Sequence, residues 1–343
     1  MSGVMGAIGS QPSTRIFLRA SVSPWCLQTV LPFPAMPWID VSDYSGQNGW
    51  AAGTDRQARA RWYCEQLEQG KILFFRQPPF RLPGPDREFL VSQKAADSRL
   101  HKNISYRPGQ DMLRGFSDDQ GNRDRVQTIM RQYSAEVTRF VSQFLAPYAN
   151  NLIMDFASFR PLEEEGRDLP LHKRNDLLHV DSFPSRPTRG GRILRVFTNV
   201  NPSKSRVWLT GENFSSLANK YAADAGLPSF ASSSGGSLRG RVMHLLSKSG
   251  LPVVERPPYD RFMLHFHDYL KENEAYQKSG EKERVEFPPM ATWLVFTDGV
   301  PHAALSGQYA MEQTYMIPPH ALVAPDAAPI RVLEKLCGKT LSS

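Results

Sequence analysis

The chain has 343 residues, of which 41% are hydrophobic and 22% are charged, enough apolar material for one large folded domain. Its three cysteines, Cys26, Cys64 and Cys337, are an odd number with no Cys-x-x-Cys spacing, which argues against a zinc site or a disulfide framework. The net charge is +7, which could favour nucleic acid. However, the sequence contains no aromatic-flanked basic run, helix-turn-helix or zinc pattern, so we expect no nucleic-acid partner. An anionic substrate or an anionic membrane face fits the charge.

Residues 1–35 differ in composition from the rest of the chain. They are rich in Gly, Ser and Pro, and no acidic residue occurs before Asp40. A targeting peptide is one interpretation, but Arg19, Ser21 and Pro24 interrupt any apolar core and no clean cleavage site follows. We therefore favour a disordered tail or an over-extended start ahead of Met36, with residues 36–343 forming a single domain. No apolar run is long enough to predict a spanning helix.

The first half of the chain favours helices around one short strand. A helix is predicted over residues 55–69 and closes at Gly70, a residue type common just beyond helix ends. Apolar residues at three- and four-residue steps predict the strongest helix of the chain over 122–146. The remaining predicted elements are a buried strand over 71–75 and a helix over 85–96.

The second half favours strands. Segments rich in β-branched and aromatic residues, bounded by Pro, Gly and Ser, predict strands over 177–181, 192–200, 206–209, 291–297 and 309–317. Between and after them we predict helices over 212–225 and 329–341 and a Ser/Gly-rich loop over 229–239. Helices followed by many short strands predict an α+β domain with a double-stranded β-helix (jelly-roll, cupin-like) core and flanking N-terminal helices.

His179 and Asp181 form a His-x-Asp pair, and His302 follows much later, after a predicted strand and turn. On a strand, residues two apart point to the same face, so His179 and Asp181 can bind one ion. Adding His302 completes a two-His, one-carboxylate triad, which leaves positions on Fe(II) open for a co-substrate and O2. The pattern predicts a non-haem Fe(II) oxygenase.

A 2-oxoglutarate oxygenase also needs a cation for the far carboxylate of the co-substrate, because a buried anion must be paired. Such a cation commonly follows the distal histidine, but residues 303–330 contain no Arg or Lys. The strand after the His-x-Asp loop offers Arg195, which alternation aims inward, and Arg192 as the alternate.

A second cluster, His265 to Asp268, competes for a metal. His265 and His267 would share a face on a strand, yet the surrounding sequence fits helical periodicity equally well. We expect a substrate-contacting or structural role for this cluster rather than a metal site.

Several segments resemble the bacterial Kdo hydroxylases, which are Fe(II)/2-oxoglutarate dioxygenases acting on 3-deoxy-D-manno-octulosonic acid (Kdo) in lipopolysaccharide. The resemblance is carried by residues 179–202, with support from 102–106, 259–269 and 298–303. It runs from about Met36 to the C-terminal region.

The resemblance implies that His179, Asp181 and His302 bind Fe(II), and that Arg195 with Arg160 anchors 2-oxoglutarate. It implies hydroxylation of carbon 3 of the outer Kdo of a Kdo2–lipid A acceptor to give Ko, with O2 consumed and succinate and CO2 released. Such an anionic glycolipid places the enzyme in the cytoplasm, with peripheral contact at the inner membrane. The candidates for acceptor contact are Lys102, Asn103, Arg174 and His267.

Two alternatives are open from the residues. An oxygenase of the same fold could act on a protein or another small molecule. A non-catalytic, cupin-like binding module would form no Fe(II)-dependent succinate.

Overall fold

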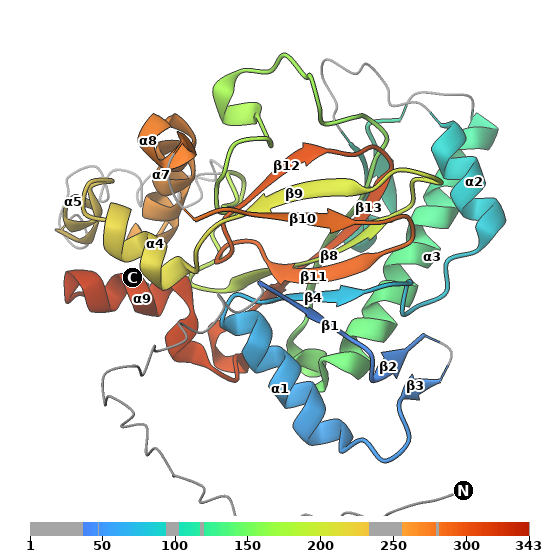
Figure 1. Cartoon of the computed structure of the whole chain (residues 1–343), viewed down its shortest axis with the longest axis horizontal. Coiled ribbons are helices and arrows are strands. Elements are labelled where there is room, and N and C mark those ends of the chain that lie inside the picture. Colours follow the sequence, from blue (N-terminus) through green and yellow to red (C-terminus); the bar gives the residue numbers. More distant parts are fainter. Residues whose placement is uncertain are drawn as a thin grey trace, which may run out of the picture. The chain divides into compact units, whose positions relative to one another are not determined.

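The computed structural model describes residues 37–46, 48–93, 103–116, 120–232, 256–278 and 281–342 (Figure 1). The predictions made for residues 1–35 and for Lys102 lie outside these residues. Within them, no helix combines the length and the apolar composition that crossing a membrane requires.

Two β-sheets form the centre of the domain. The larger has eight strands in the order β1 (Trp38–Asp40), β4 (Ile72–Phe75), β11 (Thr292–Phe296), β8 (Arg192–Asn199), β13 (Ala310–Ile317), β7 (Ile153–Arg160), β5 (Ile104–Arg107) and β6 (Met112–Arg114). Neighbouring strands are antiparallel except β1 and β4. The smaller sheet has the order β10 (Glu283–Phe287), β9 (Arg206–Thr210) and β12 (His302–Ser306). A short hairpin of β2 (Tyr44–Ser45) and β3 (Gly49–Trp50) forms a separate two-stranded sheet.

The small sheet packs on the middle of the large one (Figure 1). Phe197 and Trp293 of the large sheet and Trp208 and Phe287 of the small sheet belong to one buried cluster. The rings of Phe287 and Trp293 are stacked with centroids 3.8 Å apart. This apolar layer closes the space between the sheets except where polar side chains line it.

Helices cover the other face of the large sheet. α1 (Arg56–Glu68) and α3 (Gln120–Phe144) bury an apolar face against strands β4, β8, β11 and β13. In Figure 1, α2 (Gly84–Ser92) lies beside α3. A second helical group forms its own core at one end of the sheets, and consists of α4 (Phe214–Tyr221), α5 (Leu227–Ser232), α7 (Pro258–Glu272), α8 (Glu274–Lys278) and α9 (Pro329–Cys337). Short 3-10 helices lie at Pro108–Gln110, Ala146–Asn151, Leu171–Lys173, Pro319–Ala321 and Pro325–Ala327.

The predicted mixture of helices and sheet is confirmed. The helix predicted over 55–69 is α1, whose N-cap Asp55 accepts from two backbone amides at 3.1 Å, and Gly70 follows at φ +91°. The helix predicted over 122–146 is α3. The helices predicted over 85–96 and 212–225 are shorter, since α2 ends at Ser92 and α4 spans only Phe214–Tyr221.

One predicted element is wrong, and a second is wrong over the part that the structure describes. The segment 177–181 is not a regular strand: its single bridge joins His179 to His302, and the amide of Gln277 bonds both the N–H and the C=O of Leu178, at 3.0 and 2.9 Å. A side chain therefore takes the place of a neighbouring strand. The predicted loop 229–239 begins inside helix α5, where Phe230 packs on Phe262; its remainder lies outside the described residues.

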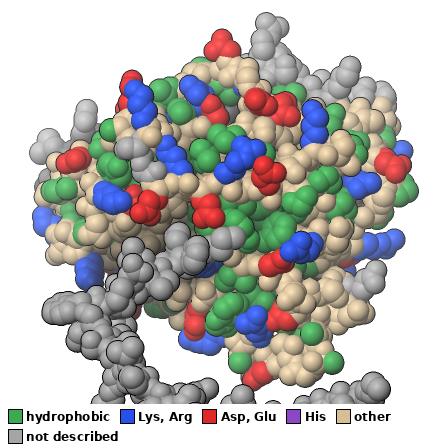
Figure 2. Space-filling model, in the orientation of Figure 1, with side chains coloured by type: hydrophobic (Ala, Val, Ile, Leu, Met, Phe, Trp, Pro, Cys, Tyr) green, Lys and Arg blue, Asp and Glu red, His purple; other side chains and the backbone are tan. Residues whose placement is uncertain are grey.

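Charged side chains of both signs are interspersed over the face shown in Figure 2, where no basic stripe is seen. This agrees with a general solvated surface on that face.

Arg192 forms a buried ion pair with Asp298 on the helix-covered side of β8. Only 1% of Arg192 is exposed, its Nε lies 2.7 Å from a carboxylate oxygen of Asp298, and the other oxygen accepts from the N–H of Ile193 at 3.0 Å. Asp298 stands in the turn between β11 and β12. The pair therefore holds the turn that leads to His302.

We predict that Asp298→Ala lowers the free energy of unfolding by about 3 to 5 kcal/mol, because it leaves the buried guanidinium of Arg192 without its partner. Chemical denaturation measures the change. The control is Asp40→Ala: Asp40 pairs with Arg76, whose side chain is 78% exposed, and surface pairs contribute at most about 1 kcal/mol. Equal losses in the two variants would contradict the prediction.

Candidate metal and co-substrate site

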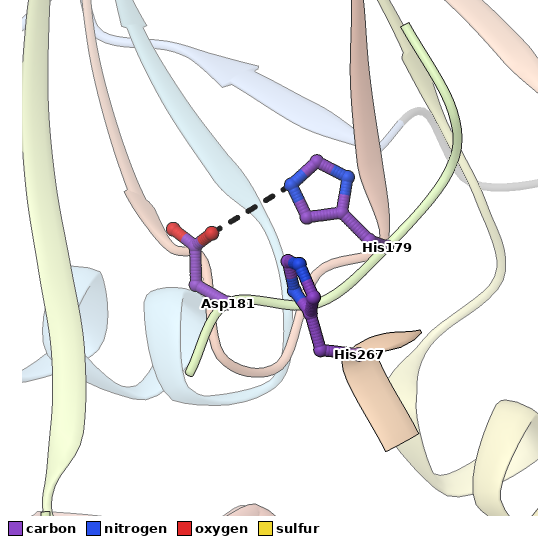
Figure 3. Close-up of side chains that lie close together, drawn as sticks. All are labelled: His179, Asp181 and His267. Atoms are coloured by element: carbon purple, nitrogen blue, oxygen red, sulfur yellow. Dashed lines mark ion pairs between the residues drawn. The ribbon is translucent and has the colours of Figure 1, made fainter. Parts of the chain in front are cut away.

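His179, Asp181 and His267 bring metal-ligand atoms together beside the sheets (Figure 3). Their ligand atoms all lie within 4.8 Å of one another, and His179 Nε2 is 3.7 Å from an oxygen of Asp181. Among the described residues, this is the group of donors compact enough to hold a metal ion as it stands. It contains His267 where the sequence predicted His302.

His302 lies against the same group. Its backbone exchanges two hydrogen bonds with His179, at 3.0 and 3.2 Å, and the two imidazole centroids are 4.8 Å apart. The ring of His302 stacks on Trp208, with centroids 5.0 Å apart. The structure therefore brings the three predicted ligands together and adds a third imidazole.

All three imidazoles are held in the tautomer that a metal requires. Their Nδ1 atoms lie 2.7 to 2.9 Å from the backbone carbonyls of Leu177, Val300 and Val180, for His179, His302 and His267 respectively. A carbonyl only accepts, so each Nδ1 carries the proton and each Nε2 keeps its lone pair. Backbone support of this kind orients metal-binding histidines.

Electrostatics favour neutral imidazoles beside an ionised carboxylate. Burial lowers the pKa of all three histidines, and for His179 the proximity of His302 lowers it further. Burial alone would raise the pKa of Asp181, but Arg195 and the histidines hold it well below its usual range. These are the protonation states in which the side chains bind a divalent cation.

His267 reaches this site from helix α7, so the segment around it, for which the sequence allowed a strand or a helix, is a helix. Residues two apart on a helix diverge, and His265 is exposed and stacks on Phe230 instead. Asp268 pairs with His172 at 3.1 Å on the surface. The local pair of histidines is thus no metal site, although His267 alone joins the first cluster.

Three arginines and three carboxylates form an alternating chain that starts at Asp181. Arg195 bonds an oxygen of Asp181 at 2.9 Å and also pairs with Glu312. Arg160 pairs with the other oxygen of Glu312 and lies 3.8 Å from Glu164. Arg206 ends the chain, 3.1 Å from Glu164. Apart from Asp181, which precedes β8, the members come from strands β8, β13, β7 and β9 and from the segment after β7.

A small cavity lies between the metal-ligand group and the far end of this chain. Its walls include His179, Asp181 and His302 at one end and Arg160 and Arg206 at the other. Phe197, Trp208 and Ala304 supply apolar surface, and Asn175 adds an amide. Nε of Arg195 and of Arg206 have no hydrogen-bond partner among the described residues. Arg206 and Arg160 line the cavity themselves, whereas Arg195 reaches it only through its contact with the lining residue Asp181.

Other predicted residues lie elsewhere. Arg192 is on the opposite face of β8, paired with Asp298, and so is not brought to the cavity. Arg174 pairs with Asp176 at 2.5 Å, and the described residues that line the cavity include neither Arg174 nor Asn103.

The comparisons with known proteins identify the family of the chain. A family model described as 3-deoxy-D-manno-oct-2-ulosonic acid (Kdo) hydroxylase matches residues 50–340. The chain belongs to the Kdo hydroxylase family. The predicted family, and with it an Fe(II)/2-oxoglutarate-dependent dioxygenase, is confirmed.

Solved structures of one family member resemble the chain over nearly its whole length. The apo structure of the Kdo hydroxylase KdoO, a non-haem Fe(II) α-ketoglutarate-dependent dioxygenase, is 33% identical, covers 89% of this chain and 97% of its own, and has a TM-score of 0.75. The complex of KdoO with α-ketoglutarate and Fe(III) has a TM-score of 0.73, and the complex with cobalt(II) 0.75, both at 33% identity. They cover 89% and 90% of this chain and 97% and 98% of KdoO. A search of curated sequences gave no match.

Sequence reasoning on this Kdo hydroxylase missed Arg206, Trp208 and Glu312. Arg206 and Trp208 alternate along β9, so both face the large sheet, and this period-two pattern was the available signal. Glu312 carries no local signal, because its role depends on the register between β13 and its neighbours β7 and β8.

We predict that Glu312→Gln destabilises the protein most above pH 4.5. Burial alone would raise the pKa of Glu312, but Arg160 and Arg195 lower it from 4.5 to about 2. A carboxyl group whose pKa is lowered by folding contributes stability at pH values above its pKa in the unfolded chain. This stability is lost as the pH falls from about 4.5 to about 2. The variant should lose about 3 to 5 kcal/mol at pH 7, because two buried guanidiniums lose their carboxylate.

Denaturation at several pH values tests this. The difference between the two proteins should shrink as the pH falls through that window. The matched control, Glu286→Gln, removes a carboxylate from an exposed pair and should show no such pH dependence. A difference that is constant over this range would contradict the assignment.

Proposed function

We propose that this Kdo hydroxylase hydroxylates carbon 3 of the outer Kdo of a Kdo2–lipid A acceptor, using Fe(II), 2-oxoglutarate and O2 and releasing succinate and CO2. The observation that carries the proposal is the cavity that connects the metal-ligand group to Arg160 and Arg206, in a chain matched to this family over residues 50–340. In this proposal the two packed sheets are the core of a double-stranded β-helix, and residues 36–343 form one domain.

We assign the metal to His179, Asp181 and His302. His302 is preferred to His267 as the third ligand because it lines the same cavity as the other two. When bound, Fe(II) with 2-oxoglutarate and O2 supplies the oxidising chemistry that replaces a C–H bond by a C–OH bond. Three protein ligands on one side of the ion leave positions for those molecules.

We assign the 2-oxoglutarate carboxylate to the guanidiniums of Arg160, Arg195 and Arg206. These three arginines pair with the carboxylates of Asp181, Glu312 and Glu164, and Arg167 also lies 4.0 Å from Glu164. A divalent cation and a dianionic co-substrate carry no net charge together, so binding both leaves the net charge of the buried site unchanged. The guanidinium fork suits a carboxylate in two-point contact.

The acceptor is proposed to approach from the side of His267. This residue stands on α7, its ring centroid 4.8 Å from that of His179, and it is absent from the residues that line the co-substrate cavity. Lys102, Asn103 and Arg174 are proposed as more distant contacts to the anionic glycolipid. Such an acceptor places the enzyme in the cytoplasm with peripheral contact at the inner membrane.

Removing a metal ligand should abolish both metal binding and turnover. We predict that His179→Ala, Asp181→Ala and His302→Ala each weaken metal affinity more than about 100-fold, beyond the range found for residues that only support a ligand. Co(II) titration followed by absorbance measures affinity, and succinate formation measures turnover.

Two histidine variants separate the roles. His267→Ala should keep one equivalent of Co(II) and lose acceptor turnover, while the control His265→Ala on the same helix should behave as wild type. Loss of metal in His267→Ala with metal retained in His302→Ala would make His267 the third ligand. Full turnover in His179→Ala would overturn the proposed function.

Removing one of the assigned guanidiniums should weaken the binding of 2-oxoglutarate. We predict that Arg206→Gln and Arg195→Ala raise the KM for 2-oxoglutarate about tenfold or more, the effect of losing a charge-assisted hydrogen bond. Arg284→Gln, on the exposed side of β10, is the control. An unchanged KM in both arginine variants would contradict this assignment.

A further inference from the structure

A second pocket, of about 200 Å³, lies at the edge of the large sheet, and the proposed reaction does not use it. Its walls come from the end of β5, the start of β7 and the loop after Asp181, and include Arg107, Met154, Asp155, Phe156 and Arg186. All of them are described residues.

Two guanidiniums lie against one aromatic ring in this pocket. The guanidinium carbons of Arg107 and Arg186 are 4.6 and 5.1 Å from the centroid of Phe156, and Arg186 is also 4.7 Å from the ring of Phe183. Aromatic contact holds both side chains in place without neutralising their charge. The pocket is therefore cationic.

These cations are not fully neutralised by the protein. Arg186 pairs with Asp155, but among the described residues no carboxylate pairs with Arg107. Nε of each arginine is buried without a hydrogen-bond partner, as is one oxygen of Asp155. Two guanidiniums against a single carboxylate leave a net positive charge and two unused donors. Arg107 is also among the causes that lower the pKa of Arg186, after burial.

An irregularity in β7 shapes this pocket. Ala157 opposes Gln313 of β13, but Met154 opposes Tyr315, so Asp155 and Phe156 together face only Thr314. Such a bulge redirects side chains beside functional sites. Here it brings Asp155 and Phe156 to the same pocket as Arg186.

The pocket lies along the same strand as the co-substrate cavity. Phe156 is four residues from Arg160 on β7, about 13 Å at the rise of a strand. Arg186 follows Asp181 by five residues, so the loop that leaves the metal site forms the pocket wall. A single sugar cannot occupy both places, whereas an oligosaccharide can.

We propose that the pocket of Arg107, Phe156 and Arg186 binds a second acidic group of the glycolipid acceptor, one that is not on the sugar being hydroxylated. The inference rests on the proposed function. The ligand chemistry is an oxyanion, either the carboxylate of the adjacent acidic sugar or a phosphate of the lipid anchor. Guanidinium donors suit both.

The side chains next to the pocket fit an acceptor with a lipid part. Ile153 and Met154 are 50% and 45% exposed, and both are among the most exposed large hydrophobic residues described. Met154 also lines the pocket. An anionic headgroup in the pocket would therefore lie beside apolar surface suited to acyl chains or a membrane face.

The test compares Arg107→Gln with Arg114→Gln, which removes an exposed arginine from the neighbouring strand β6. With Kdo2–lipid A in micelles as acceptor, Arg107→Gln should raise the acceptor KM about tenfold to 100-fold, the range for a lost charge-assisted contact. The kcat, the KM for 2-oxoglutarate and the melting temperature should match those of Arg114→Gln. Arg107→Lys should recover part of the affinity.

A direct binding measurement separates this inference from the proposed function. Co-sedimentation of the full chain with phosphatidylcholine vesicles carrying Kdo2–lipid A requires no turnover. Weaker binding by Arg107→Gln than by Arg114→Gln supports the subsite, whether or not the protein forms succinate. A wild-type protein that binds these vesicles but forms no succinate would overturn only the proposed acceptor chemistry. Equal binding and equal KM in the two variants would overturn the subsite.

Dephosphorylated Kdo2–lipid A identifies the group that is bound. If the effect of Arg107→Gln disappears with this acceptor, the pocket binds a phosphate. If the effect persists, it binds the carboxylate of the adjacent sugar.

Discussion

The alternating chain from Asp181 through Arg195, Glu312, Arg160 and Glu164 to Arg206 is the interaction on which the site depends. It starts at a proposed metal ligand, crosses three strands of the large sheet and ends on β9 of the small sheet. Every member is largely buried, so each charge has lost most of its water and must be paired by another. If one member is displaced, its neighbours lose an ionic partner. The free-energy cost of that loss favours one relative position of the two sheets at the cavity.

Such a network is a poor means of raising stability, because buried ion pairs barely repay the cost of removing their charges from water. Its value is in preorganisation. The chain holds Asp181 ionised and keeps the guanidiniums of Arg195 and Arg206 fixed, each with an unused Nε donor. A site of this kind can accept a divalent cation and a dianion with little rearrangement.

The backbone that carries His179 and Asp181 is held in an unusual way. It makes only a single bridge, from His179 to His302, and side chains from two helices bind it on either side, Gln277 at Leu178 and His267 at Val180. The second group of helices therefore helps to build the metal site rather than only covering the end of the sheets. His267 also presents a donor to the open side, where the acceptor is proposed to approach. Its role there stays a prediction.

Much of this protein is determined by local sequence. The helices 55–69 and 122–146 follow from capping and apolar periodicity, and both form close to the predicted bounds. The family follows from the residues around the His-x-Asp pair, because ligand chemistry demands those residue types at that spacing. Alternation along one strand also separated Arg195, beside Asp181, from Arg192, which faces the helices.

Tertiary structure decided what depends on strands meeting. Arg206 and Glu312 enter the site only through the register of β9 and β13 against their neighbours, which no local pattern contains. Within the segment 177–181, predicted as a strand, Leu178 instead bonds the amide of Gln277, about a hundred residues further along the chain. The sequence alone thus determined the donors and the chemistry they support. Only the packing of the two sheets and α7 decided which cations and which imidazoles surround them, because those contacts join segments far apart in the chain.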